Sequence, residues 1–317
     1  MRSESELREF FRRELLPELR GYERRRKSAL ARVWNRATAI VLVTSIVFSF
    51  AIGNPLPLVL AVAWFIYRFT QVVTSLQHDL KENLVSRVLR FWNPDLEYVP
   101  NGSIGEDEFR ASHLYSSTWN RYRGEDLVRG RSGATDFRFC ELRVTRKEQK
   151  RSEGTVFSGL FFVADFHKSF RGRTFVLPDV AERTFGSLGR ALQGLQSVDG
   201  ADLVTLENVE FEKYFRVYAT DPVEARYLLT PSLMERIVRL RKNGASEIRI
   251  AFARQKLHLA MPLSHDLFAL DPTKSAISEE GMRTWIGELE LAIGLVEELD
   301  LNTRIWSKGA PPLARTA

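Results

Sequence analysis

Three cations gathered around one glycine have the strongest case for binding chemistry. Lys168, Arg171 and Arg173 flank Gly172 in a segment between two expected strands. A basic loop close to a bilayer can bind an anionic lipid or a phosphorylated ligand, and each cation contributes about 1 kcal/mol. The competing interpretation is a solvated loop without a ligand. These three residues are the candidate site for anionic lipid or phosphate.

Other reactive side chains lack the spacing of a catalytic or metal site. Cys140 lies within an expected strand and no motif surrounds it, so we expect a buried structural thiol. The histidines are scattered rather than paired on one helix or hairpin, as a metal site would require. His258 is expected to face solvent. No catalytic, cofactor-binding or metal-ligating residue is assigned, and no cofactor is expected. The histidines are His78, His113, His167, His258 and His265.

A charged cluster at Asp221, Glu224 and Arg226 also invites a functional interpretation. The stretch Asp221-Pro222-Val223-Glu224 places an acid at the N-cap, proline at the first helical position and glutamate at the third. Helix capping therefore explains Asp221 and Glu224 without a ligand.

An uncharged run from Ala37 to Tyr67, 31 residues long, dominates the N-terminal part. As one straight helix it would measure roughly 46 Å, against about 30 Å of hydrocarbon. Two prolines and a glycine within residues 53–57 break it. We expect two helices, about Ala37–Ile52 and Leu58–Leu76. A buried hairpin in a soluble core is the alternative, although the run has no polar face to offer water.

The net charge of +6 is concentrated before this run. Residues 1–36 hold 11 Lys and Arg against 6 Asp and Glu, and the other 281 residues hold 35 against 34. A local basic block beside an apolar segment is typical of membrane orientation, and both flanks of the hairpin are basic whereas its turn is not. We therefore expect both termini to be cytoplasmic; in a bacterium, the membrane would be the inner membrane. No nucleic-acid partner is expected.

The rest of the chain alternates strand and helix patterns. An apolar stripe recurs every four residues before the hairpin, and a polar amphipathic helix follows it. Strand patterns dominate from Asp126, and Phe211–Ala219 is expected to be one of them. A helical pair is expected around 222–242, and a further amphipathic helix over 278–299. The fold class is therefore α+β, with a two-helix transmembrane hairpin followed by a mainly antiparallel sheet.

Five regions are expected from these patterns. They are a basic amphipathic juxtamembrane helix (1–36), the transmembrane hairpin (37–76), a polar helical linker (77–93), a soluble α+β domain (94–308) and a frayed tail (309–317).

Several stretches resemble a bacterial family known as domain of unknown function 3137. They are Phe157–Phe161, Asp165–Lys168, Phe170–Thr174, Phe211–Tyr218 and Asp221–Pro231, of which the last is the most specific. The likeness extends over most of the chain after about residue 90. It implies a bacterial membrane-anchored protein, and it implies no activity and no site residues.

Three functions remain as hypotheses. The first is a non-enzymatic, membrane-tethered binding or scaffold module, whose partners are the lipid bilayer and, as further candidates, other proteins or a second copy of the chain. The second is a subunit of a membrane complex with the hairpin as its interface. The third is an enzyme whose site is assembled from distant residues such as Asp126, Glu141, Asp165 and His167.

Overall fold

A computed structural model describes most of the chain. The described residues are 9–147, 154–166, 168–179, 200–243, 247–268, 287, 294–297, 299 and 301. The expected tail, His167 and most of the expected C-terminal helix lie outside them. Within the expected range of that helix, residues 287 and 294–297 are helical and residue 299 is a turn. The chain divides into two compact units. The first comprises Met1–Trp92 with Phe268–Glu288, and the second comprises Asn93–Leu267 with Leu289–Ala317.

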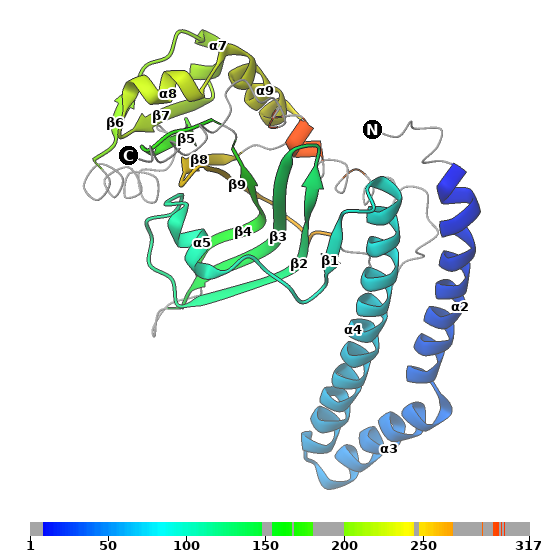
Figure 1. Cartoon of the computed structure of the whole chain (residues 1–317). Coiled ribbons are helices and arrows are strands. Elements are labelled where there is room, and N and C mark those ends of the chain that lie inside the picture. The colour runs from blue at the N-terminus through cyan, green and yellow to red at the C-terminus, as the bar shows by residue number, and fades with distance from the viewer. Residues whose placement is uncertain are drawn as a thin grey trace, which may run out of the picture. The chain divides into compact units, whose positions relative to one another are not determined.

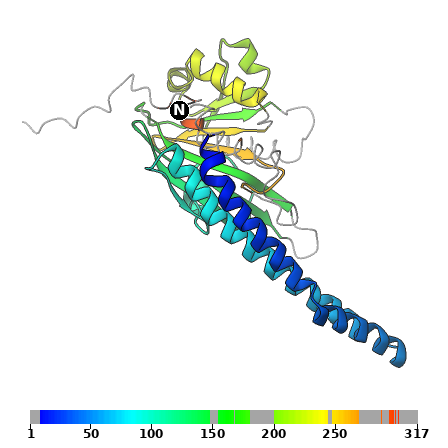
Figure 2. The same cartoon turned by 90° about the vertical axis from the view of Figure 1, so that its right-hand side faces the viewer.

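The described part of the first unit is helical. Its elements are η1 (Phe11–Leu15, a π-helical turn just before Pro17), α2 (Leu16–Val33), α3 (Arg36–Ile52) and α4 (Leu56–Trp92). Helices α2 and α4 run side by side in both views (Figures 1 and 2). Near the end of α4, Phe91 stacks on Phe10, which precedes η1, with 4.0 Å between the ring centres. The expected linker helix is continuous with the second apolar helix.

The hairpin between α3 and α4 follows from local capping. Asn35 caps the start of α3 by accepting from the Thr38 amide at 2.9 Å. Gly53 ends the helix with φ of 62°, a left-handed conformation that glycine adopts without a steric cost. The Asn54 side chain then accepts from the Leu56 amide at 2.9 Å. This turn confirms the expected break in the apolar run.

The second unit is built on one antiparallel sheet, which confirms the expected α+β class. Nine strands of the described residues pair in the order β1-β2-β3-β4-β9-β8-β5-β7-β6 (Figure 1). They are β1 (Glu97–Val99), β2 (Arg121–Ser132), β3 (Thr135–Arg146), β4 (Gly154–Asp165), β5 (Thr174–Pro178), β6 (Asp202–Val204), β7 (Phe215–Ala219), β8 (Arg249–Ala253) and β9 (Lys256–Pro262).

Short helices cover the sheet. They are α5 (Glu106–Ala111), α7 (Val209–Glu212), α8 (Pro222–Leu228) and α9 (Pro231–Lys242). Phe109 of α5 packs its ring 5.9 Å from Phe157 and 5.1 Å from Phe161, both on β4. These ring contacts hold α5 over the centre of the sheet. Glu108 is one of the residues of α5. Figure 1 shows α7, α8 and α9 grouped at the β5–β7–β6 end.

The helical pair is as expected from the sequence. Asp221 caps α8 by accepting from the amides of Val223 and Glu224, and Thr230 caps α9. The expectation of a strand starting at Phe211 is wrong. Asn208 accepts from the Phe211 amide at 2.9 Å, so the chain enters α7 first, and β7 begins only at Phe215.

Candidate functional site

The basic loop around Gly172 is held in place by its neighbours. Lys168 donates its ammonium to the carbonyl oxygens of Tyr227 at 2.7 Å and Leu228 at 3.3 Å. Partial burial lowers the pKa of this ammonium, which also lies 4.8 Å from the centre of the Tyr227 ring. Lys168 therefore stabilises the C-terminal end of α8, where a cation meets the unpaired carbonyls.

Glu224 binds the loop rather than its own helix. Its two carboxylate oxygens accept from the backbone amides of Arg171 at 2.7 Å and Gly172 at 2.6 Å. The interpretation of Glu224 as a capping residue is therefore wrong, because its side chain turns outward to a segment 52 residues earlier. A carboxylate receiving two amides makes charge-assisted hydrogen bonds, which are stronger than neutral ones. Glu224 thus fixes the backbone of the loop at two amides, and the Arg171 side chain remains exposed.

Two of the acids proposed for a distant-residue enzyme do come together. Asp126 and Glu141 lie with Glu125 in a cluster whose carboxylate oxygens are within 4.8 Å of one another, at a bulge in β2. Tyr98 donates its hydroxyl to Asp126 at 2.5 Å, and the Leu267 amide donates to Glu141 at 2.5 Å. These bonds account for the burial of both acids without a ligand.

Asp165 is not part of this cluster. Glu141 pairs in register with Leu160 on β4, and Asp165 lies five residues further along that strand, opposite Lys256. Cys140, beside Glu141, is fully buried and accepts from the Ile104 amide at 3.3 Å. Burial, together with the charges of Asp126 and Glu141, raises the pKa of its thiol to about 12. A thiol that stays protonated is a poor nucleophile, as expected for a structural cysteine.

A second polar cluster lies under α5 and was not expected from the sequence. The Glu108 carboxylate accepts from Arg138 at 2.9 Å and Lys256 at 3.3 Å, and lies 3.0 Å from Nε2 of His258. The bond to His258 and the charges of Lys256, His258 and Arg138 lower the pKa of Glu108 to about 2. His258 is fully buried, so the expectation that it faces solvent is wrong. Val163, which pairs with His258 on the neighbouring strand, is buried as well, so both side chains lie on a covered face of the sheet.

A groove of about 640 Å³ adjoins this cluster on the second unit. Its cations are already neutralised. Arg129 pairs with Glu97 at 2.9 Å, and Arg131 pairs with Asp136 at 2.8 Å. Mixed, paired charges leave little net field for attracting an ion of either sign.

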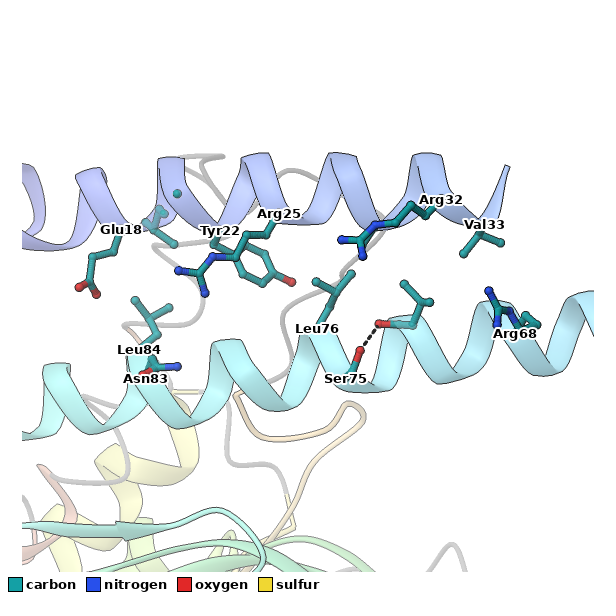
Figure 3. Close-up of a pocket in the computed structure, with 14 residues that line it drawn as sticks. Glu18, Tyr22, Arg25, Arg32, Val33, Arg68, Ser75, Leu76, Asn83 and Leu84 are labelled. Carbon is teal, nitrogen blue, oxygen red and sulfur yellow. Dashed lines mark hydrogen bonds between the residues drawn. The ribbon is translucent and has the colours of Figure 1, made fainter. Parts of the chain in front are cut away.

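The first unit holds a groove of a different character, about 550 Å³ in volume, between α2 and α4. Figure 3 shows Arg25 and Arg32 on α2 and Arg68 on α4 with their guanidinium groups directed into the space between the helices. Apolar side chains complete the wall, among them Val33, Leu76 and Leu84. From the sequence, these arginines are recognised only as basic residues that flank the hairpin. Arg68 lies 36 positions after Arg32 and 43 positions after Arg25, and no local pattern predicts that residues so far apart line one groove.

Comparisons with solved structures, curated proteins and family models give a structural likeness and a family match. A structure search gives the crystal structure of the mycobacterial trehalose monomycolate transport factor A, TtfA, with a TM-score of 0.30 and 9% identity, over 67% of this chain and 91% of that chain. No curated protein matches. Residues 155–301 match the family model described as "Protein of unknown function (DUF3137)". The match confirms, within residues 155–301, the resemblance found in the sequence.

Proposed function

We propose that the chain is a membrane-tethered binding or scaffold module of the bacterial inner membrane. In this proposal α3 and the first part of α4 cross the bilayer as a hairpin, and both termini and the sheet unit are cytoplasmic. The lipid bilayer is the first partner, and other proteins or a second copy of the chain are the further ones.

The observation that carries the proposal is the exposed apolar surface of the hairpin. Phe50 is 90% exposed and Val47 is 63% exposed. Two helical segments each contain an 18-residue stretch that is apolar enough to span a membrane, and only 6% of each stretch is buried. Such exposure does not fit the core helix of a soluble protein. Contiguous apolar surface of this extent marks a binding or membrane surface.

The polar groups of the hairpin also suit a lipid environment. The hydroxyl of Thr44 donates to the Ile40 carbonyl at 2.8 Å, and that of Ser45 donates to the Val41 carbonyl at 2.7 Å. Hydrocarbon cannot satisfy a hydroxyl, so bonding within the helix removes that cost. The stretch Leu56–Leu76 is apolar enough to span a membrane, and its one charged residue, Arg68, extends its guanidinium towards the headgroups.

The loop of Lys168, Arg171 and Arg173 remains a proposed contact for anionic lipid or phosphate. Because the Lys168 ammonium is engaged by the carbonyls of α8, the exposed Arg171 is its most available cation. Arg171→Gln should weaken binding of the full chain to anionic vesicles relative to Arg226→Gln, an exposed arginine on α8. Equal binding by the two variants would exclude the loop as a lipid contact.

Reporter fusions and alkaline extraction together test the proposal. One fusion site is Asn54 in the turn, and the other follows Ala317. We expect a reporter active outside the cytoplasm to work only at Asn54, and a cytoplasmic reporter only after Ala317. The protein should also stay with membranes in alkaline carbonate. Release by carbonate would refute the anchor, and a C-terminus that reports outside would refute the orientation.

A further inference from the structure

The groove between α2 and α4 combines positive charge with an apolar wall. Arg25, Arg32 and Arg68 reach into it from two helices (Figure 3). All three are exposed. Gly21 on α2 lies in its lining and has no atom within 4 Å of where a side chain would begin, which helps to keep the groove open.

The positive charge of this groove is not compensated within the described part of the chain. No described carboxylate forms an ion pair with Arg25, Arg32 or Arg68 there. Arg32 donates its Nε only to the Ser28 carbonyl, at 3.3 Å, and Arg68 lies 5.8 Å from the centre of the Trp64 ring. The one acid in the lining, Glu18, is bound by Arg87 at 2.7 Å. Three guanidinium groups thus line a shared space in which no described carboxylate pairs with them.

Arginine is well suited to phosphate. Its planar guanidinium donates two parallel hydrogen bonds to one phosphate, and it stays charged even when partly buried. The sheet groove of the second unit, whose arginines are paired with acids, lacks this property. The charge balance therefore separates the two grooves and favours the first as an anion site.

The position of the groove along α4 indicates the source of the phosphate. Trp34 and Phe65 meet edge to face at 5.2 Å, at the base of the exposed apolar hairpin. Arg68 lies three residues after Phe65, so the groove begins where the apolar surface ends. Tryptophan at that level is typical of the interface between hydrocarbon and headgroups. Arginines at that level reach the phosphate layer.

We propose that this groove binds the phosphate of an anionic phospholipid in the leaflet from which the hairpin enters. Arg32 and Arg68, which lie within three residues of the contact between Trp34 and Phe65, hold the phosphate, and Arg25 adds positive charge further along the groove. This inference rests on the proposed membrane anchor.

Native mass spectrometry of the full chain in mild detergent tests the site. The probes are phosphatidylglycerol, phosphatidylcholine and inorganic phosphate. The test variant carries Arg25→Gln, Arg32→Gln and Arg68→Gln. The matched control carries Arg20→Gln, Arg24→Gln and Arg90→Gln, which removes the same charge from exposed positions on the same helices outside the lining.

We expect phosphatidylglycerol to bind the control at least tenfold more tightly than the test variant, and the wild type to prefer it over phosphatidylcholine. A triple Arg→Lys variant at the three groove positions should bind with intermediate affinity, because charge remains and the paired hydrogen bonds are lost. Equal binding by test and control variants overturns the site. Inorganic phosphate bound as tightly as phosphatidylglycerol overturns the lipid as its source.

Alkaline carbonate extraction of the same variants separates this inference from the anchor. The wild type and the three variants should all stay with membranes, because the hairpin is unchanged. If wild type itself is released, the anchor fails. If every protein is retained and the lipid affinities are equal, the anchor stands and the groove site fails.

Discussion

Substitution of Glu108 should change how the stability of the second unit depends on pH. The carboxylate receives hydrogen bonds from three strand side chains, those of Arg138, Lys256 and His258. Its pKa is about 2, whereas the ordinary value is 4.5. Glu108→Gln keeps the shape and one acceptor oxygen but removes the titrating charge, so it isolates the electrostatic contribution.

The expected magnitude follows from proton linkage. The folded pKa is depressed, so the stabilisation is fully present above about pH 4.5 and is lost as the pH falls towards 2. A shift of this size corresponds to about 3 kcal/mol in total. About 2 kcal/mol of it should disappear between pH 6 and pH 3, where the unfolded state binds the proton and the folded state does not.

Hydrogen exchange of the full chain in mild detergent measures this loss. After correction for intrinsic rates, the slowest amides of β3, β4 and β9 should lose about 30-fold more protection between pH 6 and pH 3 in the wild type than in Glu108→Gln. Glu97→Gln is the control. Its carboxylate pairs with Arg129 in solvent, where an ion pair contributes little, so it should follow the wild type. Equal losses in the wild type and Glu108→Gln would refute the reasoning.

Three further changes test the packing of the second unit. Glu224→Ala should raise the exchange rate of the two loop amides that it binds by about tenfold or more, since each lost charge-assisted bond costs about 1.5–3 kcal/mol; unchanged rates would show that the loop holds itself. Gly159→Ala should lower the free energy of unfolding by about 3 kcal/mol or more in a denaturant titration, because φ is +149° and the new Cβ would lie 2.3 Å from the Met261 carbonyl oxygen; a wild-type midpoint would contradict this. Asp221→Ala should cost about 1 kcal/mol in the same titration and Asp221→Asn much less, since asparagine also caps; equal costs would argue against capping.

Local signals predicted much of the fold. The break at Gly53 and the cap at Asp221 each depend on residues within a few positions of one another. Such signals act through backbone conformation and short hydrogen bonds, so they can be read from the sequence. The wrong prediction of a strand at Phe211 also has a local cause. Asn208 caps a short helix there, whereas the alternation of apolar and polar side chains favoured a strand.

The polar clusters could not be predicted, because they join positions far apart in the chain. Glu108 meets Arg138 from 30 residues away and His258 from 150 residues away. Glu224 has the spacing of a capping box, and only the course of the loop ending at Gly172 decides that it turns outward. In each case sheet register and helix placement bring the groups together, and neither is written in a local pattern.

The outer strands of the described sheet have a consequence for behaviour at high local concentration. Both β1 and β6 are only three residues long, and each begins with an exposed acid, Glu97 and Asp202. A short, charged margin offers few free amides and carbonyls to a neighbouring copy, so strand-by-strand polymerisation has no template. Tethering would confine copies to two dimensions and raise their encounter rate. A sheet terminated in this way can be crowded on a surface and still remain free of amyloid-like assembly.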